Sequence, residues 1–412
     1  MPETSVLDDV FRRFADGSKI FKDRDVLRHD YIPEKLPHRE DQIIQLGETI
    51  APVLHGARSS NILIYGKTGT GKTAVVKYVL NHLESKAKEF GAQIKFCYVN
   101  CRMVGSEYRI FANLCQSIGV IVPFTGLSSG EVFDRFRLGL NSSKITFIII
   151  LDEVDALIKV RGDILLYELT RINEALTSSK VSLIGISNDL RLKELLDPRV
   201  LSSLSEEEMV FRPYDASELR NILFERAAAS FCGEALSEAA LNLCSALAAA
   251  EHGDARRALD LLRVAGEVAE RKGAIVVVED HVREAEKHIE HNRVIEALKN
   301  LTLHSKLVIL SVYCLSRVDV QKAITGEIYE VYSETCNEVG VAPLTQRRVG
   351  SLVNELDSMG LLNAKITSMG RYGRTKRIKL EIARGIIKDV FSDDNRLGRL
   401  VDYVPNGLSK RN

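Results

Sequence analysis

The glycine-rich segment 66–73, which reads Gly-Lys-Thr-Gly-Thr-Gly-Lys-Thr, constrains the fold of this chain more than any other feature of the sequence. An apolar run at 61–65 precedes it, and a run compatible with a helix follows at 74–80. A strand, a glycine loop and a helix in this order form the Walker A motif, in which backbone N–H groups close on phosphate oxygens. The sequence therefore predicts a nucleotide-binding turn; the alternative is a degenerate loop that keeps only the shape.

Two side chains of this loop have predicted roles of their own. Lys72 can reach the β- and γ-phosphates, and the hydroxyl of Thr73 can ligate Mg²⁺. The positive end of the helix dipole adds to the attraction for phosphate. We therefore expect ATP or ADP with Mg²⁺ as cofactors, bound by Gly66, Lys67, Thr68, Gly69, Thr70, Gly71, Lys72, Thr73 and Ala74.

A second apolar run, 145–151, ends in the carboxylates Asp152 and Glu153. A run without polar alternation indicates a strand buried on both faces, as in a parallel sheet covered by helices, and ligands of such sheets sit at the carboxyl ends of the strands. We expect Asp152 to hold Mg²⁺ or its waters and Glu153 to orient or deprotonate the attacking water. The alternative is that both residues merely cap the next helix.

A third buried-type run, 181–187, ends in the amide Asn188. Asn188 is predicted to align the attacking water or to contact the γ-phosphate. The alternative is an ordinary turn residue.

The charge distribution sets the C-terminal part of the chain apart. The formal net charge of all 412 residues is zero. Residues 300–412, however, hold 17 Lys/Arg against 12 Asp/Glu, and the segment 344–388 holds 10 against 3. This concentration of positive charge favours a nucleic-acid contact there.

Cysteine usage and the absence of apolar targeting segments bear on the compartment. Seven cysteines are spread along the chain without Cys-x-x-Cys spacing, which indicates buried thiols in a reducing compartment. The sequence shows neither a signal segment nor a bilayer-spanning run. We therefore expect a cytoplasmic, nucleoid-associated protein without a membrane partner.

Three patterns divide the chain into domains. Residues 1–213 form an N-terminal extension and an α/β core with a parallel sheet flanked by helices. Residues 214–292 follow as a small helical domain. Residues 293–395 follow as a winged helix of three helices and a two-stranded hairpin. The chain is expected to become loose from about Ser392, and residues 396–412 are assigned to this tail. The expected strands are 61–65, 94–99, 145–151, 181–187, 209–211, 361–367 and 376–381; the expected helices are 72–90, 106–118, 130–141, 163–178, 216–231, 237–251, 255–271, 278–291, 303–316, 325–339 and 345–358.

The winged-helix pattern carries the predicted DNA contacts. The third helix of such a motif lies in the major groove and reaches bases with residues near its start. Hydroxyl, amide and guanidinium groups at that start suit phosphates and base edges, and basic residues of the hairpin suit phosphates or the minor groove. The alternative for the hairpin is a solvated edge that prevents strand pairing. The predicted contacts are Thr345, Gln346, Arg347, Arg348, Arg371, Tyr372, Arg374, Lys376 and Arg377.

Four segments add to the evidence of the glycine loop. They are Tyr-Ile-Pro-Glu-Lys-Leu-Pro-His-Arg-Glu at 31–40, Leu-Asp-Glu-Val-Asp at 151–155, Asp-Pro-Arg-Val-Leu-Ser-Ser-Leu at 197–204 and Gly-Asp-Ala-Arg-Arg-Ala at 253–258. Together with the C-terminal winged helix, they make nearly the whole chain resemble an AAA+ ATPase, specifically the archaeal origin-recognition initiators related to the origin recognition complex and helicase loader of eukaryotes.

The resemblance implies roles for residues outside the two Walker motifs. Arg256 corresponds to the second sensor, an arginine of a helical lid that reaches the γ-phosphate; the alternative is an ion pair on the helix surface. Arg199 corresponds to an arginine that serves the nucleotide of a neighbouring subunit; the alternative is a salt bridge within the monomer. The segment 31–39 corresponds to the lining of the adenine pocket, where the predicted nucleotide contacts are Tyr31, Ile32, Pro33, His38 and Arg39. Tyr214, at the start of the helical domain, is also predicted to contact the nucleotide.

The family also carries a helical insertion that touches DNA. It corresponds to 121–130, where Thr125 and Ser128 are the expected phosphate donors. The resemblance implies a slow ATPase that acts as a switch, binds duplex origin DNA with other initiator subunits, and helps recruit the replicative helicase. The alternatives are an ATP-gated winged-helix transcription regulator and a clamp- or helicase-loading motor.

Overall fold

The computed structural model describes residues 17–317, 323–368 and 374–405, which fall into two compact units, Met1–Ala285 and Glu286–Asn412. Each unit is described by itself. The predicted DNA contacts Arg371 and Tyr372 lie outside the described residues, and the side chain of Arg374 is likewise not described. Within the described ranges, no helix has the length and apolar character that crossing a membrane requires.

The first unit is built around a five-stranded parallel sheet, as predicted. Its strand order is β2-β3-β4-β1-β5, and every neighbouring pair is parallel. All residues of β3, which lies inside the sheet between β2 and β4, are buried, which explains the unbroken apolar run in the sequence. The strands are β1 (Ile62–Gly66), β2 (Ile94–Asn100), β3 (Thr146–Asp152), β4 (Lys180–Ser187) and β5 (Glu207–Phe211).

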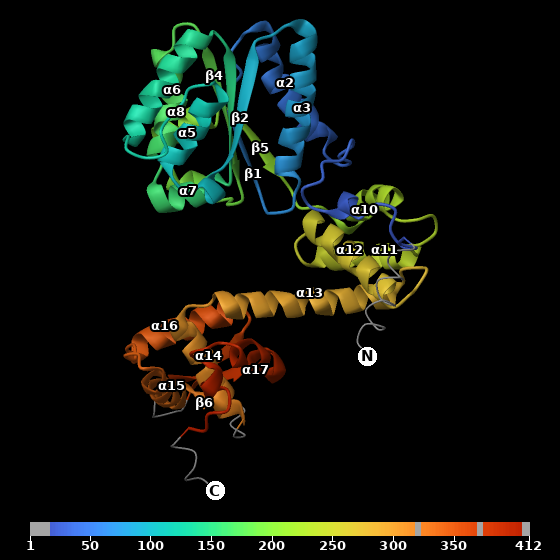
Figure 1. Cartoon of the computed structure of the whole chain (residues 1–412), viewed down its shortest axis with the longest axis vertical. Coiled ribbons are helices and arrows are strands. Elements are labelled where there is room, and N and C mark those ends of the chain that lie inside the picture. Colours follow the sequence, from blue (N-terminus) through green and yellow to red (C-terminus); the bar gives the residue numbers. More distant parts are fainter. Residues whose placement is uncertain (1–16, 318–322, 369–373, 406–412) are drawn as a thin grey trace, which may run out of the picture. The chain divides into compact units, whose positions relative to one another are not determined.

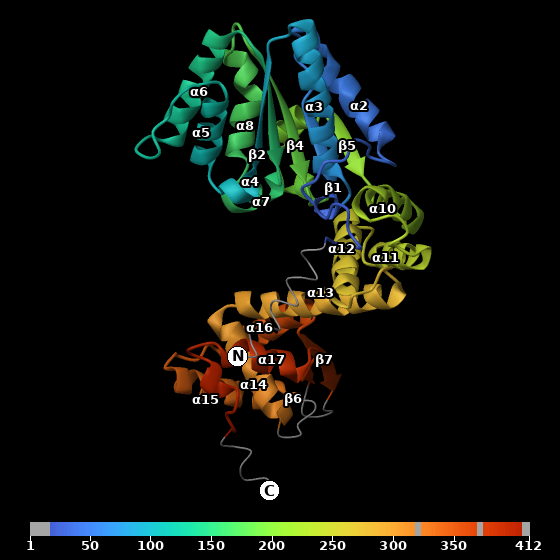
Figure 2. The ribbon, with the colours of Figure 1, turned by 45° about the vertical axis from the view of Figure 1, so that its right-hand side comes forward.

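Helices cover both faces of this sheet (Figures 1 and 2). On one face, Ile148 and Ile150 of β3 pack with buried residues of α2 (Glu40–Ile50) and α3 (Lys72–Phe90). On the other face, the alternate residues of β3 pack with α5 (Glu107–Ser117), α6 (Ser129–Ser143) and α8 (Ile164–Arg171). The shorter elements of the core are η1 (Asp25–Leu27), η2 (Ala51–His55), α4 (Cys101–Val104), α7 (Val154–Arg161), η3 (Ile172–Ala175), η4 (Leu192–Leu195) and α9 (Pro198–Leu204).

One predicted helix of the core is shorter in the structure. The sequence predicts a helix over 163–178, but α8 ends at Arg171 and a 3-10 turn follows. The side chain of Asn173 explains the change, because its amide donates to the carbonyl of Val181 (2.8 Å) and its oxygen accepts from the N–H of the same residue (2.9 Å). Asparagine thus pairs with the neighbouring strand in place of continuing the helix.

The small helical domain, called the lid below, consists of α10 (Ala216–Ser230), α11 (Glu238–Ala250), α12 (Ala255–Arg271) and the first turns of α13 (Glu279–Asn300). Asp215, Ser237 and Asp254 cap the first three helices with their side chains. The sequence predicts that the fourth helix ends at residue 291, yet α13 continues to Asn300. Residues 292–300 contain no glycine or proline, and Leu298 is buried in the core of the second unit, so nothing ends the helix earlier.

The second unit has the predicted winged-helix elements with additions. α14 (Leu303–Arg317), α15 (Thr325–Val339) and α16 (Gln346–Ser358) precede the antiparallel strands β7 (Leu362–Ser368) and β8 (Arg374–Leu380). A short strand, β6 (Ala323–Ile324), pairs with β8, so the sheet has the order β6-β8-β7. The helix α17 (Arg384–Ser392) follows the hairpin.

The expectation of a loose tail after Ser392 is wrong for the described residues up to 405. Leu397, Leu400 and Val401 are buried in the core of the second unit, around a 3-10 turn, η6 (Gly398–Leu400). Arg317 donates to the carbonyl of Val401 (2.6 Å), which ties this segment to α14. Leu397, Leu400 and Val401 have the i, i+3, i+4 spacing of an apolar helical face, but the pattern spans too few residues to predict a packed turn from the sequence.

Candidate functional site

A cavity of about 830 Å³ lies in the first unit, where the carboxyl ends of the sheet strands meet the lid. Its walls come from the glycine loop, the ends of β2 and β3, residues 29–37 and the lid helices α10 and α12. This position follows the rule that ligands of α/β sheets bind outside the carboxyl ends of the strands. The volume is that of a site for a small organic ligand.

The glycine loop places Lys72 at the start of α3, with its side chain buried. The ammonium Nζ donates to the carbonyl oxygens of Gly66 and Lys67, at 2.7 Å each, which holds it inside the loop. Burial lowers the pKa of Lys72 to about 8, although the nearby Asp152 opposes this shift. Residues 69–74 line the cavity, whereas Gly66, at the buried end of β1, and the exposed Lys67 and Thr68 do not.

The carboxylate of Asp152 is held by three donors at the end of β3. The hydroxyls of Thr73 and Tyr98 donate to Oδ2 at 2.8 and 2.5 Å, and the N–H of Glu153 donates to Oδ1 at 2.9 Å. Burial and the bond to Asp152 raise the pKa of Tyr98, so its phenol stays protonated. Tyr98 was not predicted as a site residue, and its position at the end of the strand next to β3 was the available signal.

Glu153 stands at the junction between β3 and α7 in a left-handed conformation (φ 53°). Its carboxylate makes no capping bond to α7, which argues against the alternative of a simple helix cap. The amide of Asn100 and the guanidinium of Arg102 lie 3.4 and 3.6 Å from its two oxygens. A non-glycine residue in this conformation stores strain and is typical of functional sites.

Asn188 lines the cavity from the end of β4, as predicted. Its backbone N–H donates to Oδ1 of Asp155 (3.0 Å), and the hydroxyl of Ser187 donates to the same oxygen (3.1 Å). Asp155 therefore fixes the turn that carries the Asn188 amide. The sequence did not assign this positioning role to Asp155.

The lid contacts the glycine loop directly at the start of α12. The N–H of Ala255 donates to the carbonyl of Gly69 (3.1 Å). A Cβ at Gly69 would lie 1.7 Å from Oδ1 of Asp254, so only glycine fits under the cap of α12. Asp254 accepts from the N–H of Arg256 (2.8 Å), which starts the helix beside the cavity.

Arg256 lines the cavity and has no ion-pair partner in the part of the chain that the structure describes. Its neighbour Arg257 instead pairs with Glu251, at 2.9 Å. The alternative of a helix-surface ion pair thus describes Arg257 rather than Arg256. An unpaired cation at the lid face of the cavity suits an anionic ligand.

The segment 31–39 divides into two parts. Tyr31, Ile32 and Pro33 line the cavity, and Tyr214 lines it from the end of β5. Arg39 does not line it: its guanidinium is buried and donates to the carbonyls of Thr70 (2.9 Å), His38 (3.0 Å) and Arg212 (2.7 Å).

These bonds correct the expectation that Arg39 contacts the nucleotide directly. The guanidinium carbon also lies 3.8 Å from the ring centroid of Tyr214, so Arg39 anchors the segment to the glycine loop and to β5. His38 likewise does not line the cavity, and its ring contacts Asn221 on α10 at 3.1 Å. Both residues position the wall and lie outside the cavity.

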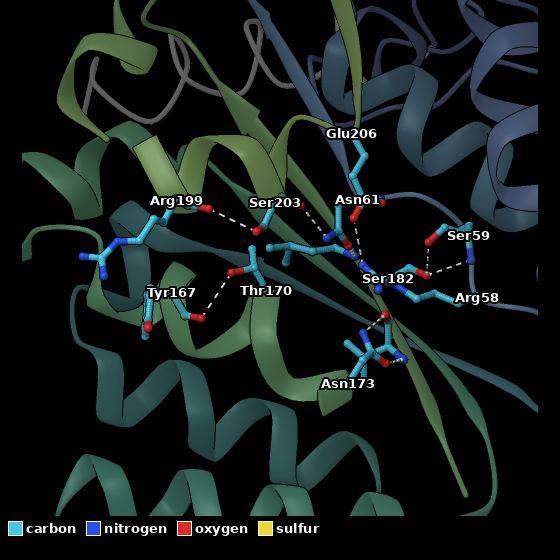
Figure 3. A network of polar contacts seen from close by, with 12 residues as sticks. Arg58, Ser59, Asn61, Tyr167, Thr170, Asn173, Ser182, Arg199, Ser203 and Glu206 are labelled. Carbon is cyan, nitrogen blue, oxygen red and sulfur yellow. Dashed lines mark hydrogen bonds and ion pairs between the residues drawn. The ribbon is translucent and has the colours of Figure 1, made fainter. Parts of the chain in front are cut away.

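Arg199 lies outside the cavity of its own chain, on α9. Its guanidinium pairs with Asp197 at 3.1 Å and lies 5.8 Å from the ring centroid of Tyr167. Figure 3 shows the side chain of Arg199 directed away from the network of polar contacts that holds α9. In that network the hydroxyl of Ser203 donates to the carbonyl of Arg199 (3.0 Å), and Asn61 donates to the carbonyl of Ser203 (2.7 Å). The intramolecular salt bridge is therefore present, with the side chain 69% exposed.

The residues at the cavity fit a Mg²⁺ ion that arrives with a nucleotide. Thr73 Oγ1 and Asp152 Oδ2 are 2.8 Å apart beside the loop. The described ranges hold no cluster of three or more His, Cys, Asp or Glu side chains that could bind a metal by itself. Mg²⁺ usually keeps several waters and binds through one or two protein oxygens plus phosphates, which is the donor set available here.

In the second unit, the predicted recognition helix exposes its start. Thr345, Gln346, Arg347 and Arg348 are all exposed, while Val349, Leu352, Val353 and Leu356 are buried against the domain. Thr345 caps α16 by accepting from the N–H of Arg348 (3.4 Å), and the Arg348 side chain lies 3.4 Å from Glu355. Arg347 has no such partner among the described residues, and its guanidinium is available to another molecule.

Of the described basic residues predicted for the hairpin, Arg377 is exposed and Lys376 is turned to the neighbouring helix. The ammonium of Lys376 donates to the side-chain oxygen of Asn354, so it is directed to α16. On the opposite face of the hairpin, Lys365 and Arg377 are exposed and directly opposite each other in the register. Like charges in this arrangement repel, which favours an anionic partner on that face. The prediction missed Lys365 because its neighbours in sequence are uncharged.

The insertion segment forms a loop between α5 and α6. Thr125 is exposed in this loop. Ser128 caps α6: its Oγ accepts from the N–H of Glu131 (3.2 Å), while its own N–H donates to the Glu131 carboxylate (3.4 Å). The backbone amide of Ser128 is therefore engaged, and only its hydroxyl hydrogen remains for a phosphate.

The lowered pKa of Lys72 predicts a pH dependence of nucleotide affinity. Only the protonated amine pairs with phosphate, and this amine loses its proton as the pH rises through about 8. Affinity should therefore be constant well below pH 8 and fall by up to about tenfold per pH unit above it. Equilibrium titration with a fluorescent ATP analogue at constant ionic strength measures this. Lys72→Arg stays charged and should remove the fall, so an equal fall in both proteins would contradict the role of Lys72.

Three family models match the chain in order. An AAA domain matches residues 56–193, a Cdc6 AAA+ ATPase-type lid domain matches 220–287, and a CDC6 C-terminal winged-helix domain matches 296–390. These models coincide with the core, the lid and the winged helix described above. They confirm the fold class that the sequence predicts.

Relatives and solved structures match over nearly the full length. The chain is 48% identical over 399 residues to an ORC1-type DNA replication protein of Thermococcus onnurineus, with 96% of each chain covered. It is 46% identical over 412 residues to ORC1-type DNA replication protein 1 of Methanosarcina mazei, covering 100% of this chain and 99% of the relative. The structure of the Aeropyrum pernix ORC1 protein in complex with DNA is 47% identical, with a TM-score of 0.83 and coverage of 93% and 99%.

A more distant structure shares the fold alone. Cdc6p from Pyrobaculum aerophilum is 22% identical, with a TM-score of 0.58 over 90% of this chain and 98% of that one. The family resemblance expected from the motifs is thus confirmed by sequence and by structure. Since close relatives match from end to end and the three family models follow in order, this chain belongs to the archaeal ORC1-type DNA replication proteins, AAA+ ATPases with a Cdc6-type lid and a C-terminal winged helix.

Proposed function

We propose that this protein is an ATP-dependent initiator of DNA replication that binds duplex origin DNA and helps to recruit the replicative helicase. The observation that carries the proposal is the 47% identity, over 93% of the chain, to an ORC1 protein whose structure was solved in complex with DNA. The chain's own geometry supports it, with a nucleotide cavity in one unit and an exposed basic helix start in the other. We place the protein in the cytoplasm, associated with the nucleoid.

The cavity residues suit slow hydrolysis of ATP to ADP and phosphate. The loop amides and Lys72 would hold the β- and γ-phosphates, and Arg256 would reach the γ-phosphate from the lid. Glu153 would accept a proton from the attacking water, with the Asn188 amide aligning that water. Mg²⁺, held by Thr73 and Asp152, would neutralise charge on the phosphate oxygens. Because Asp254 and Ala255 contact the glycine loop, loss of the γ-phosphate would change the position of the lid relative to the core.

The assembly formed on DNA would include further initiator subunits. Arg199 is exposed and lies outside its own cavity, so it could reach a nucleotide only in a neighbouring molecule. Its salt bridge holds the guanidinium beside Asp197, the residue that caps the start of α9. We propose that Arg199 acts in such an assembly as an arginine finger.

The winged helix would bind duplex DNA through α16 and the hairpin. Charge reversal at Lys365 and Arg377 together should weaken duplex binding and reduce the slope of log affinity against log salt by about 2, since each lost phosphate contact lowers it by about 0.9. Fluorescence anisotropy at several salt concentrations measures this slope. Lys88→Glu reverses an exposed charge on α3 and is the matched control, for which no change is expected. An unchanged slope in the double variant would mean that the hairpin is only a solvated edge.

The proposal as a whole is tested by selecting bound fragments from the source genome with the purified, nucleotide-loaded protein. We expect a small set of related duplex sites to be enriched over bulk DNA. Equal recovery of all fragments would contradict sequence-specific initiation. Arg347→Ala should retain general affinity better than the hairpin variant but lose part of this enrichment, because base contacts specify and phosphate contacts position.

A further inference from the structure

Arg226, on the lid helix α10, is a buried cation at the cavity that no part of the hydrolytic site uses. It lines the cavity next to Tyr31, and only 8% of its surface is exposed. Its Nη2 donates to the carbonyl oxygen of Tyr31 (3.2 Å), and its guanidinium carbon lies 4.7 Å from the centroid of the Tyr31 ring. The residue thus joins the lid to the N-terminal segment across one wall of the cavity.

The second amino group of this guanidinium has no partner. Nη1 is buried and makes no hydrogen bond in the described residues, and no carboxylate there forms an ion pair with Arg226. A buried donor without an acceptor is costly, and a buried cation without a counter-ion more so. Such a group is expected to have a partner in the working complex. Since Arg226 lines the cavity, a ligand there with a hydrogen-bond acceptor could supply this partner once the shielded Nη1 turns toward it.

The surroundings of Arg226 indicate which part of a nucleotide would meet it. The phosphates belong at the glycine loop, where Lys72, Arg256 and the amides gather. Arg226 instead sits with Tyr31, Ile32 and Pro33 and with Ala229 one turn further along α10, a mainly apolar and aromatic wall that suits a flat ring. Ring nitrogens of a purine are acceptors that lie in the plane of that ring.

We propose that Arg226 is a specificity-determining residue of the nucleotide site, which donates from Nη1 to a ring nitrogen of the purine base. This inference rests on the proposed function, since it requires that the cavity binds ATP. It adds a base contact from the lid to those expected from the segment 31–33. A base held in this way contacts the lid and the N-terminal segment at once.

The N-terminal segment, residues 20–39, also contacts the lid and the glycine loop, which gives the proposal a second consequence. Residues 20–23 are fastened to the lid: the N–H groups of Lys22 and Asp23 donate to the carbonyl of Ser230 (2.8 and 3.1 Å), and Phe21 packs on Phe231 at 5.0 Å between centroids. Arg39 fastens the other end to the glycine loop. A purine bound to Arg226 and Tyr31 should therefore slow hydrogen exchange at Lys22 and Asp23, whereas tripolyphosphate, which has no base, should not.

The test compares ATP with tripolyphosphate as ligands of the full-length protein. Arg226→Met should weaken ATP about ten- to hundredfold, the loss expected for a charge-assisted hydrogen bond, and leave tripolyphosphate unchanged. Arg226→Lys keeps the charge but cannot donate to the Tyr31 carbonyl and to the base at the same time. Its ATP affinity should therefore fall nearly as far as that of Arg226→Met. The matched control is Arg220→Met on the same helix, where the arginine pairs with Glu238 outside the cavity and no loss is expected.

Two results would overturn the proposal. An equal loss for ATP and tripolyphosphate in the Arg226 variants would show a merely structural role, and unchanged ATP affinity would show no role. If the wild-type protein itself failed to bind ATP, the proposed function would fail instead, so the two failures are distinguishable.

Deaza analogues of ATP locate the contact. At least one of 1-deaza-, 3-deaza- and 7-deaza-ATP should bind the wild-type protein more weakly than ATP does, while Arg226→Met should bind that analogue and ATP alike. If every analogue lost the same factor in both proteins, the acceptor would not be a ring nitrogen and the proposal would fall.

Discussion

Replacing Lys72 with alanine should weaken ATP binding by at least about a hundredfold while the protein remains folded. The ammonium lies buried inside the glycine loop and is fixed by the carbonyls of Gly66 and Lys67, so it is already oriented for phosphate. Loss of charge-assisted bonds to two phosphate oxygens, each worth about 1.5–3 kcal/mol, corresponds to two or more decades in affinity. Isothermal titration of Mg–ATP into the full-length protein measures the effect.

The neighbouring Lys67 provides the matched control for this prediction. Its side chain is exposed on the same loop and does not line the cavity. Lys67→Ala should therefore bind ATP within a few-fold of the wild-type protein. If Lys72→Ala bound ATP as tightly as the wild-type protein, the assignment of the loop as the phosphate site would be refuted. If Lys72→Ala and Lys67→Ala lost the same affinity, the cause would be the net charge of the loop.

Replacing Glu153 with glutamine should slow single-turnover hydrolysis of bound ATP about a hundred- to ten-thousandfold, the usual contribution of a general base. The substitution keeps the size of the side chain and the possibility of a bond to Asn100, so ATP affinity should change little. The strained backbone at Glu153 holds the carboxylate at the end of β3 and should tolerate glutamine equally. Rapid quench of a single turnover separates this step from nucleotide release.

Two further variants frame this result. Asp155→Asn should slow hydrolysis less, because it disturbs the turn carrying Asn188 without removing the base. Glu174→Gln, at an exposed glutamate beside Arg171, is the control and should be inert. Undiminished single-turnover hydrolysis in Glu153→Gln would exclude this residue as the base.

Local patterns predicted most of the fold because each of its parts has a local physical cause. The buried strands appear as unbroken apolar runs, and the capping residues Ser237 and Asp254 stand where helices begin. The residues that share the cavity with the glycine loop could also be predicted, because parallel strands bring Asp152 and Asn188 to the same edge of the sheet. These inferences need only periodicity and order along the chain.

The remaining features depend on contacts between distant residues, which no local pattern reveals. Arg226 meets Tyr31 across 195 positions, and Arg39 meets Arg212 across 173. For the same reason the sequence could not tell that Arg39 anchors a wall, or that Lys376 turns to Asn354 while Lys365 faces outward. The packing of Leu397, Leu400 and Val401 is a further case, because three apolar residues in a short polar segment do not predict burial.

The central claim, that this chain initiates replication at duplex origins, is tested most directly by mapping the chromosomal sites that the protein occupies in growing cells of its source organism. Crosslinking and sequencing of bound DNA gives these sites, and the starts of replication are mapped in the same cells from copy number. The account predicts that the occupied sites cluster at the replication starts. Occupancy centred on promoters away from those starts, or spread evenly along the chromosome, would contradict it and favour a transcription regulator or a non-specific ATPase.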